Sequence, residues 1–182
     1  MNTISKKANI GNNVSIGEYT VIKDDVIIGD NVEIASNVLI DNGARISSNV
    51  KIHHGAAISG FPQDLKFNGE TTTLEIGENT VVREFATLNR GTSASKKTII
   101  GKNCLLMAYS HVAHDCVLGD NVIFANSVNL GGHVQVDDWA IVGGICGVHQ
   151  FVRIGRHSII ASNSRIHKDV PPYITANDYP LK

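Results

Sequence analysis

Isoleucine recurs at every sixth residue from Ile10 to Ile58, and apolar residues, mostly aliphatic, keep the same spacing from Ile100 to Ile166. Neither an α-helix, with a period of about 3.6 residues, nor a flat strand, with a period of about 2, explains a strict period of six. A six-residue repeat is typical of a parallel β-helix, in which each hexad supplies one side of a coil. The sequence therefore predicts an all-β solenoid.

The residues between the repeated aliphatic positions predict how a coil closes. They are mostly Gly, Asn, Asp and Ser, as in the segment 28–32, and Gly and Asn tolerate the positive φ of a tight turn. The residue four places after each repeated position is small, and we expect it to turn inward as well. Three hexads then close a triangular coil of eighteen residues, in which residues eighteen apart stack at about the 4.8 Å spacing of adjacent strands.

Two stretches keep the count of six but break the pattern. Asp64 and Glu70 occupy repeat positions in the first stretch, and Ala94 does so in the second. Charged and flexible residues cannot line an aliphatic stack, so we expect protruding loops near 61–75 and 91–98. Such excursions often carry the specificity of a repeat protein. We expect one domain over residues 1–170 and a short C-terminal tail over 171–182.

Composition and cysteine placement exclude several classes of protein. The net charge of −1 argues against a nucleic-acid binder, and the sequence contains neither a leader nor an apolar run of membrane-spanning length. We therefore expect a soluble cytoplasmic protein that does not insert into a membrane. Cys104, Cys116 and Cys146 fall at the small inward position of their hexads, which predicts buried apolar side chains rather than nucleophiles or disulfides.

Between residues 106 and 153, histidines replace the usual turn residues of the hexads. Their spacing predicts which side chains meet, because residues eighteen apart stack in successive coils. The predicted ladders are His114 with Gly132 and Gln150, Asp115 with His133 and Phe151, and His111 with Asn129.

This cluster suits acyl transfer. The imidazole of His114 can accept a proton from an attacking hydroxyl or amine, while the carboxylate of Asp115 fixes its tautomer and stabilises the imidazolium. The N–H of Gly132 can stabilise a tetrahedral oxyanion, so no serine or cysteine nucleophile is needed. Zinc is the competing interpretation, since trimeric carbonic anhydrases on this scaffold bind it through three histidines. His111 and His114 lie in different hexads with different directions, and we therefore expect no metal.

Several motifs together carry a resemblance to a known family. They are Gln63–Lys66, Arg83–Glu84, Asn89–Thr92, His111–Cys116, Gly132–Val134, Val136–Asp138, Val148–Phe151 and Asp169–Tyr173. Over nearly its whole length the chain resembles the acyl-carrier-protein:UDP-N-acetylglucosamine O-acyltransferases, which begin lipid A synthesis.

The resemblance implies a left-handed β-helix that forms a homotrimer, with active sites in the clefts between neighbouring subunits. It implies His114 as general base, Asp115 as its support and the Gly132 N–H as oxyanion donor. No cofactor is implied, because the acyl donor is a thioester of acyl carrier protein or coenzyme A that acts as a co-substrate. The implied substrate-binding residues are Asp64, Lys66, His111, His133, His149 and Gln150.

The chain also departs from the family. Members continue after the proline–tyrosine corner into a helical C-terminal domain that helps to bind the nucleotide and the carrier protein, whereas this sequence ends at Lys182. Asn89 stands where some members have His. Ser162 falls at the end of the family's acyl pocket, where some members have a smaller residue, which suggests a shorter or more polar acyl group.

A basic stretch near the C-terminus suggests where an acidic donor binds. No Asp or Glu lies between Trp139 and Lys168, whereas Arg153, Arg156 and Arg165 do. We expect these arginines to contact acyl carrier protein or the phosphates of coenzyme A.

Two further functions remain open. The first is N-acylation of a nucleotide-linked amino sugar from an acyl-CoA, which shares the scaffold and fits Ser162. The second is a solenoid that serves as an assembly platform or ice-binding face, although such a protein predicts a flat repeated surface without the polar interruption at 106–153.

Overall fold

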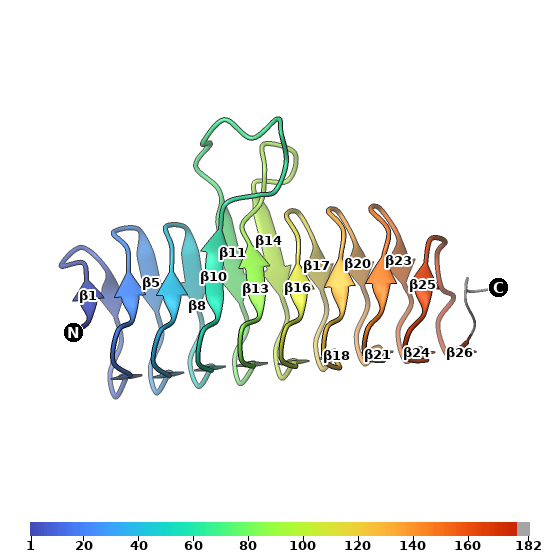
Figure 1. Ribbon diagram of the computed structural model, residues 1–182, viewed down its shortest axis with the longest axis horizontal. Coiled ribbons are helices and arrows are strands. Elements are labelled where there is room, and N and C mark those ends of the chain that lie inside the picture. The colour runs from blue at the N-terminus through green and yellow to red at the C-terminus, as the bar shows by residue number, and fades with distance from the viewer. Residues whose placement is uncertain (178–182) are drawn as a thin grey trace.

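The computed structural model describes residues 1–177, which wind short parallel strands into a triangular prism with the first and last described strands at its opposite ends (Figure 1). Each coil contributes one strand to each of three sheets. Ile22 pairs with Ile40, and Ile28 pairs with Ile46, each eighteen positions later. The predicted eighteen-residue coil is therefore confirmed.

The three sheets take their strands in strict rotation along the chain. The first sheet contains β1 (Thr3–Ile4), β4 (Val21–Ile22), β7 (Leu39–Ile40), β10 (Ala57–Gly60), β13 (Thr87–Asn89), β16 (His111–Val112), β19 (Asn129–Leu130), β22 (Gly147–Val148) and β25 (Arg165–Ile166). The second contains β2 (Asn9–Ile10), β5 (Val26–Ile28), β8 (Ala44–Ile46), β11 (Thr73–Ile76), β14 (Lys97–Ile100), β17 (Val117–Leu118), β20 (Gln135–Val136) and β23 (Arg153–Ile154). The third contains β3 (Ser15–Ile16), β6 (Glu33–Ile34), β9 (Lys51–Ile52), β12 (Val81–Val82), β15 (Leu105–Leu106), β18 (Ile123–Phe124), β21 (Ile141–Val142), β24 (Ile159–Ile160) and β26 (Thr175–Ala176).

The repeated aliphatic residues fill the centre of the prism. Ile40, Ile58 and Leu106 are completely buried, and each such side chain stabilises the fold by about 1.5–3 kcal/mol. The cysteines are buried among them, as expected. Burial raises the pKa of Cys104 to about 11 and that of Cys116 to about 12. These thiols therefore stay protonated and unreactive at neutral pH.

The corners of the prism depend on residues in the left-handed backbone region. The third residue after a repeat position adopts a φ near +60°, for example 57° at Asn31, 59° at Asp115 and 62° at His133. Asn and Asp tolerate this conformation better than other side chains. Trp139 and Phe151 adopt it too, because the neighbouring corner rings on which they stack offset its cost.

Two loops leave the corner between the first and second sheets, at the positions where the repeat is broken (Figure 1). Residues 61–72 join β10 to β11, so that Ile58 pairs with Leu88, thirty rather than eighteen positions later. Residues 90–96 join β13 to β14, and Val82 pairs with Leu106, twenty-four positions later. The core stack stays continuous because both loops contain whole hexads. We refer to this edge of the prism as the loop corner.

The coil continues into the segment that we expected to be a tail. Strand β26 pairs with β24, and Val170 forms a bridge to Ile154, so residues up to Ala176 extend the prism. Residues 178–182 of the predicted tail lie outside the described residues. Within residues 1–177 there is no helix long and apolar enough to cross a membrane.

Candidate active site

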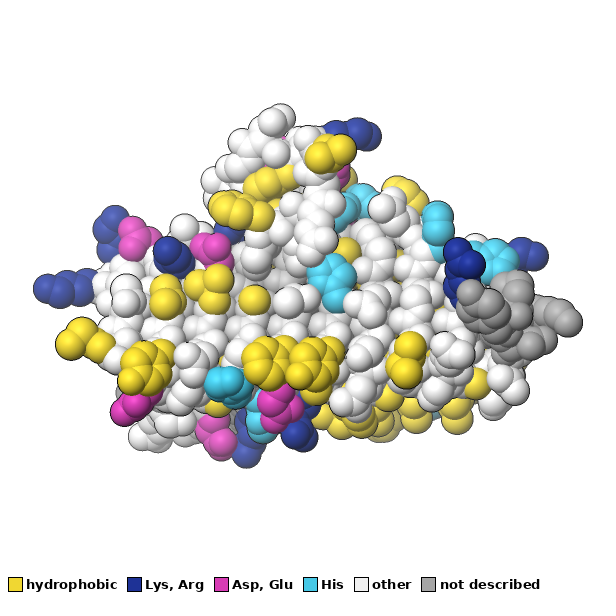
Figure 2. Space-filling model, in the orientation of Figure 1, with side chains coloured by type: hydrophobic (Ala, Val, Ile, Leu, Met, Phe, Trp, Pro, Cys, Tyr) yellow, Lys and Arg dark blue, Asp and Glu magenta, His cyan; other side chains and the backbone are white. Residues whose placement is uncertain are grey.

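The predicted histidine cluster lies at the loop corner, where the turns after β16 and β19 pass beneath the two protruding loops. Histidine side chains are visible beside the base of the loops and along the C-terminal half of the prism (Figure 2). The turn after β16 carries His114 and Asp115, and the turn one coil later carries Gly132 and His133. The fold therefore brings the expected acid–base pair and the expected oxyanion donor to one edge.

His114 and Asp115 form a buried hydrogen-bonded pair. The Nδ1 atom of His114 lies 2.8 Å from Oδ2 of Asp115, and the side chains are 7% and 0% exposed. The Asp115 backbone N–H donates to Oγ1 of Thr98 at 2.9 Å, which fixes the turn. Because the carboxylate carries no proton, Nδ1 carries the hydrogen of the pair. The Nε2 lone pair of His114 is then free to accept a proton from a substrate.

The 90–96 loop holds the Asp115 carboxylate in its ionised form. The backbone N–H and the hydroxyl of Thr92 donate to the carboxylate at 2.9 and 2.6 Å, and the Ser95 hydroxyl adds another short bond. Burial alone raises the pKa of Asp115, but the hydrogen bonds from Ser95, Thr92 and His114 outweigh it and hold the pKa well below its usual range. Asp115 is therefore a fixed negative charge behind the imidazole.

Gly132 lies directly against the imidazole of His114. A Cβ on Gly132 would come within 2.5 Å of His114 Cε1 and 2.7 Å of Nε2, closer than any side chain can approach. The Gly132 N–H makes no hydrogen bond with any other described residue. The position thus combines an available donor with an open approach to the histidine, as an oxyanion site requires.

His133 completes the cluster from the next coil. Its Nε2 lies 3.8 Å from Oδ2 of Asp115, and its ring meets the ring of His114 edge-on at 5.1 Å. On its other side it stacks on Phe151 at 4.6 Å. The predicted ladder of Asp115, His133 and Phe151 is therefore confirmed. Gln150 lies in the coil after Gly132, with its Cγ 2.9 Å from where a Cβ on Gly131 would be.

The nitrogen and oxygen atoms of His114, Asp115 and His133 lie within 4.8 Å of one another, close enough to hold a metal ion. The carboxylate already accepts bonds from Thr92, Ser95 and His114, however, and these donors compete with a metal for the same lone pairs. The arrangement suits a hydrogen-bonded acid–base pair better than a three-ligand metal site.

His111 lies on the outer face of the first sheet, paired with Asn129 as predicted. Its Nδ1 lies 2.7 Å from the Thr87 hydroxyl. Burial lowers the pKa of His111 and outweighs the opposing effect of the Thr87 contact, so the ring is neutral at physiological pH. A neutral, oriented ring presents its second nitrogen as a hydrogen-bonding group to a bound ligand.

The 61–72 loop carries Asp64 and Lys66 to the same corner. A small hollow of about 170 Å³ is lined by Asp64, Lys66, Phe67, Glu70, Thr92, Ser93, Ala94 and His133. The hollow therefore combines residues from both loops with a histidine of the cluster. The loop is shaped locally by Asp64, whose side chain and carbonyl accept the N–H groups of Lys66 and Phe67 at 2.9 and 3.0 Å.

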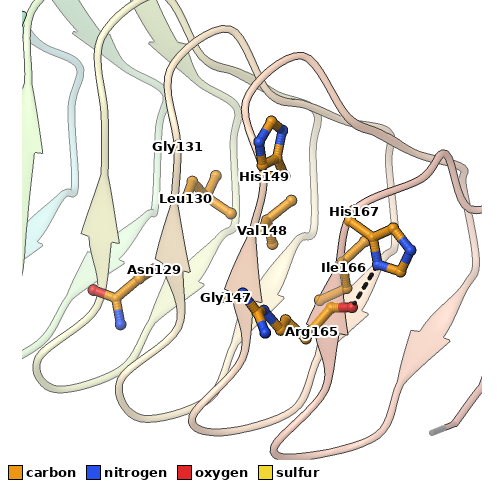
Figure 3. A pocket seen from close by; sticks show the side chains of 9 residues that line it. All are labelled: Asn129, Leu130, Gly131, Gly147, Val148, His149, Arg165, Ile166 and His167. Carbon is orange, nitrogen blue, oxygen red and sulfur yellow. Dashed lines mark hydrogen bonds between the residues drawn. The ribbon is translucent and has the colours of Figure 1, made fainter. Parts of the chain in front are cut away.

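A larger, mostly apolar groove of about 620 Å³ runs along the outer face of the first sheet (Figure 3). Its floor includes Gly147, where an added Cβ would meet nothing within 4 Å. His149 and His167 border the groove from successive coils (Figure 3). The groove is lined by Asn129, Leu130, Gly131, Gly147, Val148, His149, Arg165, Ile166 and His167.

Other expected site residues are not brought together. Ser162 is exposed in the turn between β24 and β25 and does not line the groove. Arg153 lies on the second sheet and pairs with Asp137 at 3.3 Å, and Arg156 lines a separate hollow with Asp137 and Asp138. Only Arg165 of the three expected donor-binding arginines lies beside the groove.

Thr92, Ser95 and Thr98 were not recognised from the sequence as part of the site. Thr92 stands in a motif of the family resemblance, but the hexad repeat shows only that the chain leaves the coil there. Tertiary contacts decide which loop atoms fold back onto Asp115, and the six-residue repeat of the sequence does not encode these contacts. Hydroxyl residues in a loop predicted to protrude near the expected carboxylate of Asp115 were the available signal.

Replacing Thr92 with valine should lower the free energy of unfolding by about 1.5–3 kcal/mol, because the ionised carboxylate loses a buried donor. Folding lowers the pKa of Asp115, so its stabilisation is present above about pH 4 and is lost as the pH falls towards the lower folded-state pKa. The difference between variant and wild type should therefore shrink in acid. Urea unfolding at neutral and acidic pH measures it, with the exposed Thr71→Val as control. Equal losses in both variants would refute a specific role for Thr92.

The chain is also similar in sequence to known proteins. Residues 7–42 and 97–132 match the profile of the family described as bacterial transferase hexapeptide (six repeats). Acyl-[acyl-carrier-protein]–UDP-N-acetylglucosamine O-acyltransferase of Helicobacter pylori is 55% identical over 115 residues, which cover 63% of this chain and 43% of that protein. The Aliarcobacter butzleri protein of the same name is 49% identical over 174 residues, 95% of this chain and 67% of that protein.

Solved structures agree over nearly the whole chain. LpxA of Acinetobacter baumannii superposes with a TM-score of 0.97 at 43% identity, covering 99% of this chain and 70% of that one. LpxA of Bacteroides fragilis, a UDP-N-acetylglucosamine acyltransferase, gives 0.98 at 44% identity, covering 100% and 71%. These similarities confirm the predicted left-handed winding. The chain spans less than half the length of several curated relatives that it matches.

Proposed function

The chain belongs to the family of acyl-[acyl-carrier-protein]–UDP-N-acetylglucosamine O-acyltransferases, and we propose that it transfers an acyl group from an acyl carrier protein thioester to the 3-hydroxyl of UDP-N-acetylglucosamine. The observation that carries this proposal is the buried pair of His114 and Asp115 beneath Gly132. Acyl transfer to a hydroxyl needs a base, a support for its charge and an oxyanion donor, and His114, Asp115 and Gly132 are suited to these three roles.

In the proposed reaction, the pair acts directly on the two bound substrates. His114 Nε2 removes the proton of the sugar hydroxyl while the oxygen attacks the thioester carbonyl. The Gly132 N–H donates to the oxyanion of the tetrahedral intermediate, and Asp115 stabilises the imidazolium. Collapse of the intermediate breaks the carbon–sulfur bond, and the imidazolium returns its proton to the departing thiolate. The products are the sugar ester and the free thiol of the carrier, with no covalent enzyme intermediate.

The substrates can be placed along the corner and the first sheet. In this proposal Asp64, Lys66 and His133 bind the sugar nucleotide in the hollow between the loops. The acyl chain follows the apolar groove past His149 and Gly147, and Gln150 and His111 contact the substrates beside the reacting atoms. Arg165 at the groove is the arginine best placed to meet the acidic donor. The thioester acts as a substrate, and the chemistry requires no cofactor.

We also propose that the protein acts as a homotrimer, in which neighbouring subunits close the open groove. The outer face of the third sheet supports the proposal of an interface between copies. Along this face, the side chains are polar in the first coils and apolar in the later ones. Hydrophobic side chains line the lower edge of the C-terminal half in Figure 2. Ile141 and Ile159 are 36% and 46% exposed there. The apolar row consists of Val81, Leu105, Ile123, Ile141 and Ile159, and the polar one of Ser15, Glu33 and Lys51.

Replacing Ile141 with glutamate should break this assembly, since a charge would be buried between subunits without a partner. We expect the species seen by size-exclusion chromatography with light scattering to shift from trimer to monomer, with loss of turnover. Ser15→Glu on the same sheet, in the polar part, should leave the trimer intact. A wild-type monomer that is fully active would contradict the proposal.

The function is tested by identifying the product. Wild-type protein is incubated with 3-hydroxyacyl carrier protein and UDP-N-acetylglucosamine, and the acylated sugar nucleotide is detected by mass spectrometry. We expect a single added acyl group that mild base removes, because an ester is cleaved under conditions that leave an amide intact. A base-stable product, or transfer only from acyl-CoA to an amino sugar, would replace the proposal with N-acylation.

A further inference from the structure

Arg90 is a buried cation at the base of the 61–72 loop. The residue is 7% exposed, and Nη1 donates to the carbonyl of Asn42 at 2.6 Å. The guanidinium carbon lies 4.5 Å from the ring centre of Phe61 and 5.8 Å from that of Phe67. The side chain therefore connects an early coil of the prism to both aromatic residues of the loop.

The polar contacts of this cation are incomplete. Its Nε atom is buried without a hydrogen-bond partner, and the ion pairs formed among residues 1–177 do not include Arg90. A buried charge without a carboxylate is costly, and the two aromatic faces offset only part of that cost. An uncharged side chain of similar length would fill the same space without the penalty. What an arginine adds here, compared with an uncharged side chain, is therefore the contact of the guanidinium with the Asn42 carbonyl and with the rings of Phe61 and Phe67.

Two further hydrogen bonds, both to backbone carbonyls, form beside the Arg90 side chain. The Arg90 N–H donates to the carbonyl of Gly60 at 3.1 Å, and the Asn89 amide donates to the carbonyl of Phe61. Together these contacts hold the end of β10 and the first residue of the 61–72 loop against the end of β13. Phe67, at the far side of the guanidinium, lines the hollow that contains Asp64 and Lys66. A shift of Phe67 would therefore move a wall of this hollow.

We infer that Arg90 is a positioning residue that sets the conformation of the 61–72 loop and thereby the affinity for the acceptor. The inference rests on the proposed function only in that the hollow beside the loop binds the sugar nucleotide. The hydrogen-bonded pair of His114 and Asp115 lies outside the contacts of Arg90. Loss of the guanidinium should therefore weaken acceptor binding and leave the acid–base step unchanged.

The test compares Arg90→Met, which keeps the length of the side chain without its charge, with Arg90→Lys, which keeps the charge without the planar group. Hydrogen exchange of residues 61–72 is measured without substrate, and KM, kcat and the pH–rate profile are measured with it. In Arg90→Met we expect faster exchange in the loop and a KM for the sugar nucleotide raised about tenfold, with an unchanged pH profile. Arg90→Lys should restore part of the affinity.

Arg45→Met serves as the matched control, because Arg45 also donates to a backbone carbonyl, that of Asp25, and its hydrogen bonds go to Asp25 and Ala44 rather than to the loop. It should leave both the loop exchange and KM unchanged. Unchanged loop exchange in Arg90→Met would overturn the inference, as would faster exchange without a change in KM. If the wild type transfers no acyl group to the sugar nucleotide, the proposed function fails, and the exchange data alone then decide whether Arg90 holds the loop.

Discussion

Replacing His114 with alanine should reduce the turnover of acyl transfer by about a hundredfold to ten-thousandfold, the usual contribution of a positioned general base. Without the imidazole, no described side chain in the cluster takes its place beside Gly132, where Nε2 now lies. Asp115 keeps its bonds to Thr92 and Ser95, so the corner should stay folded. Initial rates of thiol release at saturating substrate measure the effect.

His157→Ala is the control for this prediction. His157 stacks between Trp139 and Tyr173 at a different corner, far from the proposed chemistry. It should retain nearly full turnover, which would show that removal of a stacked histidine is not harmful in itself. A His114→Ala protein that has the melting temperature and oligomeric state of the wild type and still turns over at its rate would eliminate His114 as the base.

Gly132→Ala should reduce turnover about a hundredfold, the cost of displacing a catalytic group by about 1 Å. The added methyl group would lie 2.5 Å from Cε1 of His114, so the ring or the coil must move. Gly132 does not adopt a positive φ, and backbone strain is therefore not the reason for the loss. Steady-state kinetics should show the fall mainly in kcat, because the geometry of the reacting atoms is what changes.

Gly60→Ala separates this effect from the general cost of replacing a glycine. An added Cβ at Gly60 meets nothing within 4 Å, and its activity should stay within about twofold of the wild type. A crystal structure or NMR titration of Gly132→Ala should show the His114 ring displaced from Asp115. If Gly132→Ala has the kinetic constants of the wild type, the reaction depends neither on the observed position of the His114 ring nor on the space between that ring and Gly132.

The strict period of six made the coil predictable, because a repeat of identical length must return to the same side of the prism. It also placed Asp115 beneath His133 and His111 beside Asn129, since these contacts follow from counting eighteen residues. Positive φ at Asn31 and its equivalents was expected from the tolerance of asparagine for that conformation. Each of these features follows directly from sequence distance.

Features that depend on a loop or on side-chain direction could not be obtained by counting. The bonds from Thr92 and Ser95 to Asp115 form because the 90–96 loop folds back over the corner. Three nearby arginines in sequence suggested one basic surface, but the coil turns Arg153 and Arg165 onto different sheets. Neighbours along a β-helix lie on different faces, so a charge cluster in the sequence does not imply a cluster in space.

The central claim, that this chain transfers an acyl group to a sugar hydroxyl, is tested most directly by thiol release from 3-hydroxyacyl carrier protein. The wild-type protein is assayed with UDP-N-acetylglucosamine, with the corresponding amino sugar nucleotide and with no acceptor. We expect rapid release only with UDP-N-acetylglucosamine, one thiol for each ester formed. Release that occurs only with the amino sugar, or that is independent of any acceptor, would contradict it.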